Sequence, residues 1–281
     1  MQAKVALIQM NFSDDAEHNV GRASARIAEA ASAGAEIVCL PELATSIYFC
    51  TEIEREHYKL AESVNGPSVS AIAEAARAAG VYVVFPFYER DDEDEQLYNT
   101  AAFIDRRGEV TGRYRKNIIP LTKFTGEIGI EKYYFRPGNL GYPVFDTDLG
   151  IRVGITICFE RHFPESGRSL ALNGADLIFV PTATPAGKDM WDVELRSIAI
   201  ANLLWVAGVN RVQRDVNGSD MDFYGKSLVA GPSGEVVAAA GEEAEEILYA
   251  EIDTEQSQQL REEWGFFRDR RPEIFGAITR L

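Results

Sequence analysis

The chain has 281 residues, of which 28 are Lys or Arg and 44 are Asp or Glu, so its formal net charge is −16. This balance argues against a nucleic-acid-binding protein, which needs a basic surface for phosphates, and against binding to an anionic membrane. Hydrophobic residues make up 46% and charged residues 26%, which allows a buried core and excludes a disordered or collagen-like chain.

The sequence shows no pattern typical of export or membrane insertion. Residues 1–10 contain one Lys and a short apolar run without a cleavage site, so we expect a first strand there and no signal peptide. No apolar run reaches the roughly 18 residues that cross a bilayer. The 3 Cys residues are too few, and odd in number, for a disulfide framework. We therefore expect a cytoplasmic protein.

Strand and helix patterns alternate through the first half of the chain. The expected elements are, in chain order, strand 4–10, helix 17–33, strand 36–40, helix 68–79, strand 81–87, strand 98–104 and strand 109–114. Residues 89–96 carry six acidic side chains between two of these strands. Because such a run repels itself and resists burial, we expect a solvated hairpin loop. A cation site is the alternative, although the run lacks the spaced Gly of a calcium loop.

The second half repeats this alternation. Its expected elements are strand 152–157, helix 164–173, strand 176–180, helix 190–202, strand 204–209, a hairpin of 225–230 with 235–239, and strand 247–252. Continuous apolar strands are typical of sheets buried on both faces, with helices outside. Two similar halves therefore predict a pseudo-symmetric, layered α/β sandwich. A doubly wound nucleotide-binding fold is the alternative, but no Gly-x-Gly-x-x-Gly follows the first strand.

Cys158 is the candidate nucleophile, since it ends an apolar strand shortly before the helix expected to begin at Pro164. Open α/β folds place their sites at this edge of a sheet, and a helix N-terminus would favour a thiolate. The alternative is a small buried apolar Cys. Cys39 lies inside a strand and is expected in the core, whereas Cys50 follows in a loop and is expected to be partly buried and inert.

A protonated thiol needs a base or a positive field to become a nucleophile. His18 and His57 occupy positions expected to be exposed on helices, and His162 follows Cys158 by only four residues. Glu42, at the end of a buried strand, is the better candidate base if burial raises its pKa. Lys116, in apolar company, could stabilise an oxyanion, or it could be a surface Lys of the basic run 113–116.

Three segments around these residues resemble the motifs of the nitrilase (carbon–nitrogen hydrolase) superfamily. They are Leu40-Pro41-Glu42-Leu43, Arg115-Lys116-Asn117-Ile118-Ile119-Pro120 and the run from Ile157 through Cys158 to Glu165. The resemblance implies a Glu42, Lys116 and Cys158 triad that hydrolyses a non-peptide C–N bond. It also implies a four-layer α-β-β-α sandwich with pseudo-two-fold halves.

The N-carbamoyl amide hydrolase branch is the most similar. Residues 131–139 resemble the segment that supplies a second active-site glutamate there, which implies that role for Glu131, and Cys158-x-x-Arg161-His162 resembles β-ureidopropionases. The implied substrate is an N-carbamoyl compound such as N-carbamoyl-β-alanine, giving an amine, ammonia and carbon dioxide. The alternatives are N-carbamoylputrescine, an N-carbamoyl-α-amino acid, an aliphatic amide, a nitrile (suggested by Glu160) and, in another class, a non-catalytic interaction module.

Four residues are candidates for contact with the substrate. Arg161 could hold a carboxylate through two hydrogen bonds, unless it pairs with Glu160 or Glu165. The backbone N–H of Phe159 would share the oxyanion with Lys116, and His162 and Tyr48 are further candidates. Three scattered His residues offer few metal ligands, so we expect no metal and no cofactor.

We expect a single domain over residues 1–281, with 254–281 as a C-terminal extension at an oligomer interface. The resemblance implies a homodimer or a larger homo-oligomer. The aromatic residues of the extension are compatible with this, because exposed aromatics are a liability on a monomer, but they could also pack on their own domain. They are Trp264, Phe266, Phe267 and Phe275.

Overall fold

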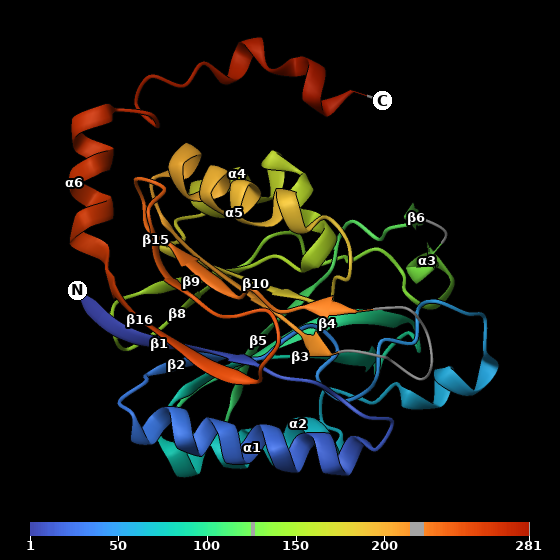
Figure 1. Ribbon diagram of the computed structural model, residues 1–281. Helices are drawn as coiled ribbons and strands as arrows, with labels where there is room; N and C mark the ends of the chain where they lie inside the picture. Colours follow the sequence, from blue (N-terminus) through green and yellow to red (C-terminus); the bar gives the residue numbers. More distant parts are fainter. Residues whose placement is uncertain (125–126, 214–221, 281) are drawn as a thin grey trace.

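The computed structural model describes residues 1–124, 127–213 and 222–280. A six-stranded sheet with the strand order β16-β1-β2-β3-β4-β5 forms the first half. Its strands are β1 (Gln2–Gln9), β2 (Ile37–Cys39), β3 (Tyr82–Arg90), β4 (Leu97–Ile104), β5 (Val110–Arg115) and β16 (Glu246–Asp253). The three strands β1, β2 and β3 are parallel, and the others pair antiparallel. Helices α1 (Ala16–Ser32) and α2 (Pro67–Ala79) cover its outer face (Figure 1).

The second sheet has the order β15-β14-β11-β10-β9-β8 and repeats this plan. Its strands are β8 (Val144–Asp146), β9 (Arg152–Ile155), β10 (Leu177–Thr182), β11 (Trp205–Asn210), β14 (Leu228–Ala230) and β15 (Val236–Ala239). Helices α4 (Pro164–Leu172) and α5 (Lys188–Asn202) lie on the opposite side of the molecule from α1 and α2 (Figure 1). The expected four-layer sandwich of two similar halves is therefore confirmed.

Alternating side chains explain why the strands are apolar on both faces. In β1, Val5 and Leu7 point into the core between the sheets, whereas Ala6 and Ile8 pack beneath α1 and α2. Successive strand residues point to opposite faces, so a strand between a sheet and a helical layer needs apolar residues at every position.

The remaining elements lie outside the expected patterns. They are η1 (Arg55–Leu60), β6 (Thr122–Phe124), β7 (Glu127–Gly129), α3 (Glu131–Tyr134), η2 (Cys158–His162), β12 (Val212–Gln213), β13 (Phe223–Tyr224), α6 (Thr254–Trp264), η4 (Pro272–Ile274) and η5 (Gly276–Thr279). The hairpin expected over 225–230 and 235–239 is present, because β14 pairs antiparallel with β15, but its first strand covers only Leu228–Ala230. Similarly, the strand expected over 152–157 ends at Ile155.

The acidic run at residues 89–96 is only partly a solvated loop, which corrects the expectation that all of it is solvated. Glu89 and Asp91 are buried, because β3 continues to Arg90. Arginines across the sheet compensate their charge: Arg115 donates to Glu89 Oε1 over 2.8 Å and also bonds Asp91, and Arg113 pairs with Glu89. Paired carboxylates can be buried where isolated ones cannot.

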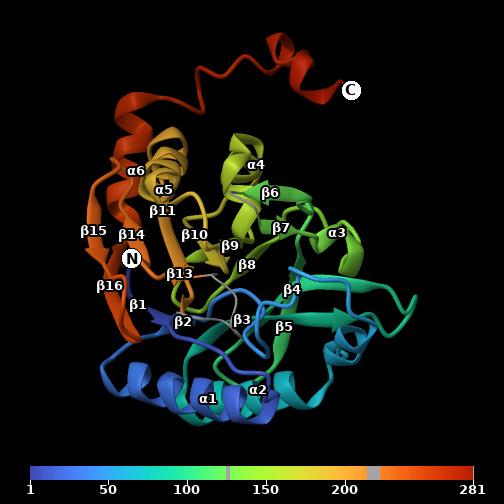
Figure 2. The same cartoon turned by 45° about the vertical axis from the view of Figure 1, so that its right-hand side comes forward.

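The chain after α6 passes above α4 and α5, on the side away from the first sheet (Figures 1 and 2). Phe267 packs against the core beneath these helices, so this part of the extension does fold back on its own chain. Trp264 and Phe275 remain largely exposed. Within the described residues, no helix combines the length and the apolar character needed to cross a bilayer.

Candidate active site

Glu42 lies in the turn directly after β2 and is fully buried. Its Oε1 accepts hydrogen bonds from Lys116 Nζ and Asn99 Nδ2, both at 2.8 Å. Its Oε2 accepts one from the backbone N–H of Ala183 at 2.9 Å, just beyond β10 of the other sheet. A carboxylate oxygen accommodates about two donors. Oε1 is therefore saturated by these bonds, whereas Oε2 keeps one acceptor position beyond its bond to Ala183.

Lys116 follows β5 and pairs with two carboxylates, so the alternative prediction of a surface Lys is wrong. Its Nζ lies 2.8 Å from Glu42 Oε1 and 2.7 Å from Glu131 Oε2. Burial alone would favour the neutral amine, but the charges of Glu131 and Glu42 raise the pKa of Lys116 well above its usual value. An ammonium has three N–H donors, and these two bonds leave one of them for another acceptor.

Glu131 is the first residue of α3 and is buried beside Lys116. Its Oε1 accepts a hydrogen bond from the Tyr48 hydroxyl at 3.0 Å. Burial raises the pKa of Glu131, although the adjacent ammonium opposes this. The structure therefore brings Glu42, Lys116, Glu131 and Tyr48 into one continuous hydrogen-bonded cluster.

Cys158 begins η2 with a φ of 50°, a left-handed conformation that non-glycine residues rarely adopt. Burial first, and then the charge of Glu42, raises the pKa of its thiol to about 12, while Lys116 and Arg161 oppose the rise. Because the charges of Glu42 and Lys116 act on the thiol, Cys158 lies close to their hydrogen-bonded cluster. With its pKa raised in this way, the thiol needs a base to become a nucleophile, as expected for a protonated cysteine.

Arg161 and His162 share one carboxylate, that of Glu194 on α5. Arg161 Nε lies 2.9 Å from Glu194 Oε2, and His162 Nδ1 contacts Glu194 Oε1. The alternative partners expected for Arg161, Glu160 and Glu165, are therefore wrong. Arg161 Nη1 also donates to the carbonyl of Cys158 over 3.0 Å and lies 4.0 Å from its Sγ.

The turn that carries Cys158 is held by Glu160. Both carboxylate oxygens of Glu160 lie 2.6 Å from the Tyr114 hydroxyl, and they accept the backbone N–H groups of Ile157 and Asn117. Burial raises the pKa of Glu160 to about 7. This position after the nucleophile thus has a structural role in holding the turn.

Phe159 is half-buried, and its ring contacts those of His162 and Phe163. Its backbone N–H lies in the first turn of η2, where donors lack an acceptor within the helix. This donor directly follows Cys158 in the chain, and its role at the oxyanion stays a prediction.

Two expectations about other Cys and His residues are corrected. Cys39 is in the core and His18 is exposed, as expected, but Cys50 is fully buried rather than partly so. His57 is half-buried, because its ring packs on Phe49 and its Nδ1 lies 3.2 Å from the Tyr134 hydroxyl. In the described ranges, no group of three or more His, Cys, Asp or Glu side chains is arranged to hold a metal ion.

Sequence reasoning missed two buried residues that contact Glu42. Asn99 on β4 donates to its carboxylate, and Arg211 donates to its backbone carbonyl. A signal was present for Arg211, since Asn210 and Arg211 directly follow an apolar strand, as Glu42 does. Asn99 lies within its strand and offered no such signal.

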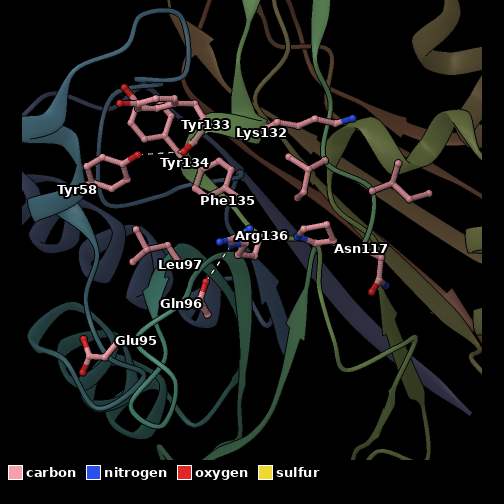
Figure 3. A pocket seen from close by; sticks show the side chains of 13 residues that line it. Tyr58, Glu95, Gln96, Leu97, Asn117, Lys132, Tyr133, Tyr134, Phe135 and Arg136 are labelled. Atoms are coloured by element: carbon pink, nitrogen blue, oxygen red, sulfur yellow. Dashed lines mark hydrogen bonds between the residues drawn. The ribbon is translucent and has the colours of Figure 1, made fainter.

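A pocket of about 770 Å³ is lined by residues that directly follow Lys116 and Glu131 in the chain. Tyr133, Tyr134 and Phe135 line it, and Arg136 is bonded to Gln96 at its wall (Figure 3). None of the four buried residues Glu42, Lys116, Glu131 and Cys158 lines this pocket. It is therefore separate from the buried cluster.

Comparison with known proteins gives consistent matches over nearly the whole chain. The family model described as carbon–nitrogen hydrolase matches residues 4–262. The chain is 36% identical to a citrullinase of Francisella tularensis, covering 99% of this chain and 98% of that protein. It is 34% identical to the N-carbamoylputrescine amidase of Solanum lycopersicum, covering 99% and 95%. It is 33% identical to the β-ureidopropionase of Arabidopsis thaliana, covering 95% and 68%.

A solved structure supports the same assignment of the fold. The carbon–nitrogen hydrolase of Helicobacter pylori superimposes with a TM-score of 0.90 at 28% identity, covering 100% of this chain and 99% of that chain. The similarity thus includes both halves of the sandwich and the C-terminal segment.

Proposed function

Because the chain belongs to the carbon–nitrogen hydrolase family, whose members hydrolyse amide-like substrates, we propose that it hydrolyses a terminal ureido group, H₂N–CO–NH–CH₂–R. Citrulline, N-carbamoylputrescine and N-carbamoyl-β-alanine, for which the three relatives are named, share this group. The observation that carries the proposal is a buried Cys158 beside the hydrogen-bonded Glu42, Lys116 and Glu131.

In the first step, Glu42 takes the thiol proton and Cys158 Sγ attacks the ureido carbon. Oε2 is the acceptor atom, because Oε1 is already saturated by Lys116 and Asn99. The free N–H of Lys116 and the backbone N–H of Phe159 stabilise the negative charge that develops on the carbonyl oxygen. One such donor contributes about 3–4 kcal/mol to the transition state.

In the second step, the proton on Glu42 passes to the leaving nitrogen as its C–N bond breaks, which leaves a thioester on Cys158. Glu42 then takes a proton from water, and the resulting hydroxide displaces the thiolate, which recovers its proton. Carbamic acid or its N-substituted form decomposes to carbon dioxide and the second amine. The net reaction consumes one water and releases R–CH₂–NH₂, ammonia and carbon dioxide.

Glu131 orients the substrate nitrogen in this scheme. Its carboxylate is fixed from two sides by Lys116 and Tyr48, so its position is defined before the substrate binds. Its raised pKa also suits it to assist proton transfer to the leaving nitrogen.

The surroundings of Arg161 bear on the charge that R can carry. A carboxylate, as in N-carbamoyl-β-alanine, would need an available cation, but Arg161 is already paired with Glu194. The charges near Cys158 therefore largely compensate each other, and the proposal covers ureido substrates whose R group is either anionic or cationic. N-carbamoyl-β-alanine remains the second, more specific candidate, because Arg161 lies 4.0 Å from the Cys158 sulfur.

A substrate panel with ammonia release as the readout tests the proposal. It contains N-carbamoyl-β-alanine, N-carbamoylputrescine, citrulline, N-carbamoyl-α-amino acids, a simple amide and a nitrile. We expect at least one ureido compound to be hydrolysed with kcat/KM about 100-fold above the amide and the nitrile, and Cys158→Ala to be inactive but folded. Faster hydrolysis of the amide or the nitrile, or an active Cys158→Ala variant, would contradict it.

The proposed assembly is a homo-oligomer of single-domain chains. Trp264, Ile274 and Ile278 in the C-terminal extension are 62%, 60% and 64% exposed. A groove of about 590 Å³ between this segment and helices α4 and α5 has apolar residues among its lining. Light scattering on the whole chain and on its Ile274→Glu and Ile278→Glu variants tests the oligomeric state. The three unpaired cysteines support a reducing, cytoplasmic location.

A further inference from the structure

Arg211 is a fully buried arginine behind the turn that carries Glu42. Its Nε and Nη2 lie 3.1 Å and 2.8 Å from the backbone carbonyl of Glu42, and Nη2 also donates to the carbonyl of Leu43 over 2.6 Å. Among the described residues, no carboxylate side chain forms an ion pair with it, and Nη1 has no hydrogen-bond partner. Its bonds are thus directed at the backbone of one turn.

This turn needs an external support. Leu43 has a φ of 53°, in the left-handed region that a branched side chain adopts at a cost. Arg211 satisfies the carbonyl of Leu43 and that of the preceding residue, while Asn99, Lys116 and Ala183 hold the carboxylate of Glu42 from the front. The backbone and the carboxylate of Glu42, the proposed base, are therefore held by different residues.

The guanidinium of Arg211 is also a buried charge. It lies 4.5 Å from the ring centre of Phe12 and 5.9 Å from that of Phe223. Burial lowers the pKa of Arg211 to about 10, and the charge of Glu42 is the largest influence that opposes this. Arg211 therefore stays cationic at neutral pH, although the burial of a charge in such a site is costly.

We infer that Arg211 is a positioning residue for Glu42: it fixes the turn that presents this carboxylate to Cys158, and it places a fixed positive charge behind the acceptor of the thiol proton. The inference rests on the proposed role of Glu42 as base. The other titratable groups that act in this site are Lys116 after β5, Glu131 on α3, Cys158 on η2, and Tyr48 and Cys50 in the loop after β2.

Variants that remove or keep the charge of Arg211 distinguish a positioning role for Glu42 from a role in packing alone. We expect Arg211→Gln to lower kcat about 100-fold with little change in KM, and to move the acidic limb of the kcat/KM profile up by about one pH unit. Arg211→Lys keeps the charge but cannot donate to both carbonyls in the same geometry. It should keep the acidic limb near its original pH while lowering kcat about tenfold.

Arg261 provides a matched control. Its Nε and Nη2 also donate to two backbone carbonyls, those of Leu203 and Ala175, both over 3.1 Å, and it stacks on Phe267 at 5.4 Å. Arg261→Gln should reduce thermal stability while leaving the pH profile unchanged. A pH profile and kcat for Arg211→Gln that match those of Arg261→Gln would overturn the inference.

Two further outcomes separate this inference from the proposed function. If Glu42→Gln retains full activity, Glu42 is not the base and the proposed mechanism fails. If Glu42→Gln is inactive but Arg211→Gln behaves as wild type, only the role of Arg211 fails. Should Arg211→Gln not fold, unchanged kcat in Arg211→Lys would equally contradict the positioning role.

Discussion

Arg161 Nε lies 2.9 Å from Glu194 Oε2, so the cation closest in sequence to Cys158 already has a counterion. The Arg161 side chain is 2% exposed and that of Glu194 19%. Removal of the Glu194 charge would leave Arg161 available to an anionic substrate, because a buried cation without a partner gains from any carboxylate within reach.

We therefore expect Glu194→Gln to change the substrate preference. The ratio of kcat/KM for N-carbamoyl-β-alanine to that for N-carbamoylputrescine should rise about tenfold, equal to about 1.4 kcal/mol. Glu165→Gln is the control, because Glu165 is exposed in the same groove and does not pair with Arg161. An unchanged ratio in Glu194→Gln would mean that Arg161 does not face the substrate.

The raised pKa of Cys158 predicts how its alkylation depends on pH. Since only the thiolate reacts, the rate of modification by iodoacetamide should rise about tenfold per pH unit between about pH 6 and pH 9. Mass spectrometry of the intact chain measures the rate, and Cys158→Ala corrects for Cys39 and Cys50, which are both buried. A plateau below about pH 8 would show a stabilised thiolate instead.

Lys116→Met would leave two buried carboxylates, Glu42 and Glu131, without their shared cation. We expect hydrolysis to fall at least about 100-fold and the free energy of unfolding to fall by about 3–5 kcal/mol near neutral pH. Chemical denaturation and ammonia release measure the two effects.

This loss of stability should shrink as the pH falls. Burial already raises the pKa of Glu131, and loss of the ammonium raises it further, so the folded variant binds a proton more tightly than the unfolded chain. Stability gained from that proton is present at low pH and disappears as the pH rises. Lys132→Met, at the exposed neighbouring position on α3, should have a small effect at every pH.

The layers of the fold could be predicted because they follow from local patterns. The continuous apolar strands and the helices expected over 17–33 and 68–79 need no knowledge of distant residues. The four-residue α3 is too short for helical periodicity. The burial of Glu89 depended on Arg115, which lies two strands away in the sheet.

The motifs identified Glu42, Lys116, Glu131 and Cys158 as candidates, but they did not reveal what fixes them. Arg211, which directly follows β11 of the second sheet, reaches the carbonyl of Glu42 across 169 positions of the chain. Such a contact depends on how the two sheets stack, and no spacing in the sequence encodes it. The partner of Arg161 was unpredictable for the same reason, since Glu194 comes from a different helix.

The contact between Tyr114 and Glu160 predicts a stability effect that depends on pH. Tyr114→Phe removes the hydroxyl that lies 2.6 Å from both oxygens of Glu160. Burial raises the pKa of Glu160 from its ordinary 4.5 to about 7, and the Tyr114 hydrogen bond restrains this rise. The pKa should therefore be higher in the variant. A carboxyl group with a raised pKa in the folded state stabilises the fold at low pH and loses that contribution as the pH rises.

The variant should accordingly lose about 1–3 kcal/mol of unfolding free energy near pH 8, where Glu160 must be ionised without its donor, and clearly less near pH 5.5, where the carboxyl is protonated. Urea denaturation at both pH values measures the difference. Tyr142→Phe is the control, because the Tyr142 hydroxyl bonds Ser166 at 2.9 Å rather than Glu160. Equal losses at the two pH values for Tyr114→Phe would show that Glu160 keeps one protonation state throughout this range.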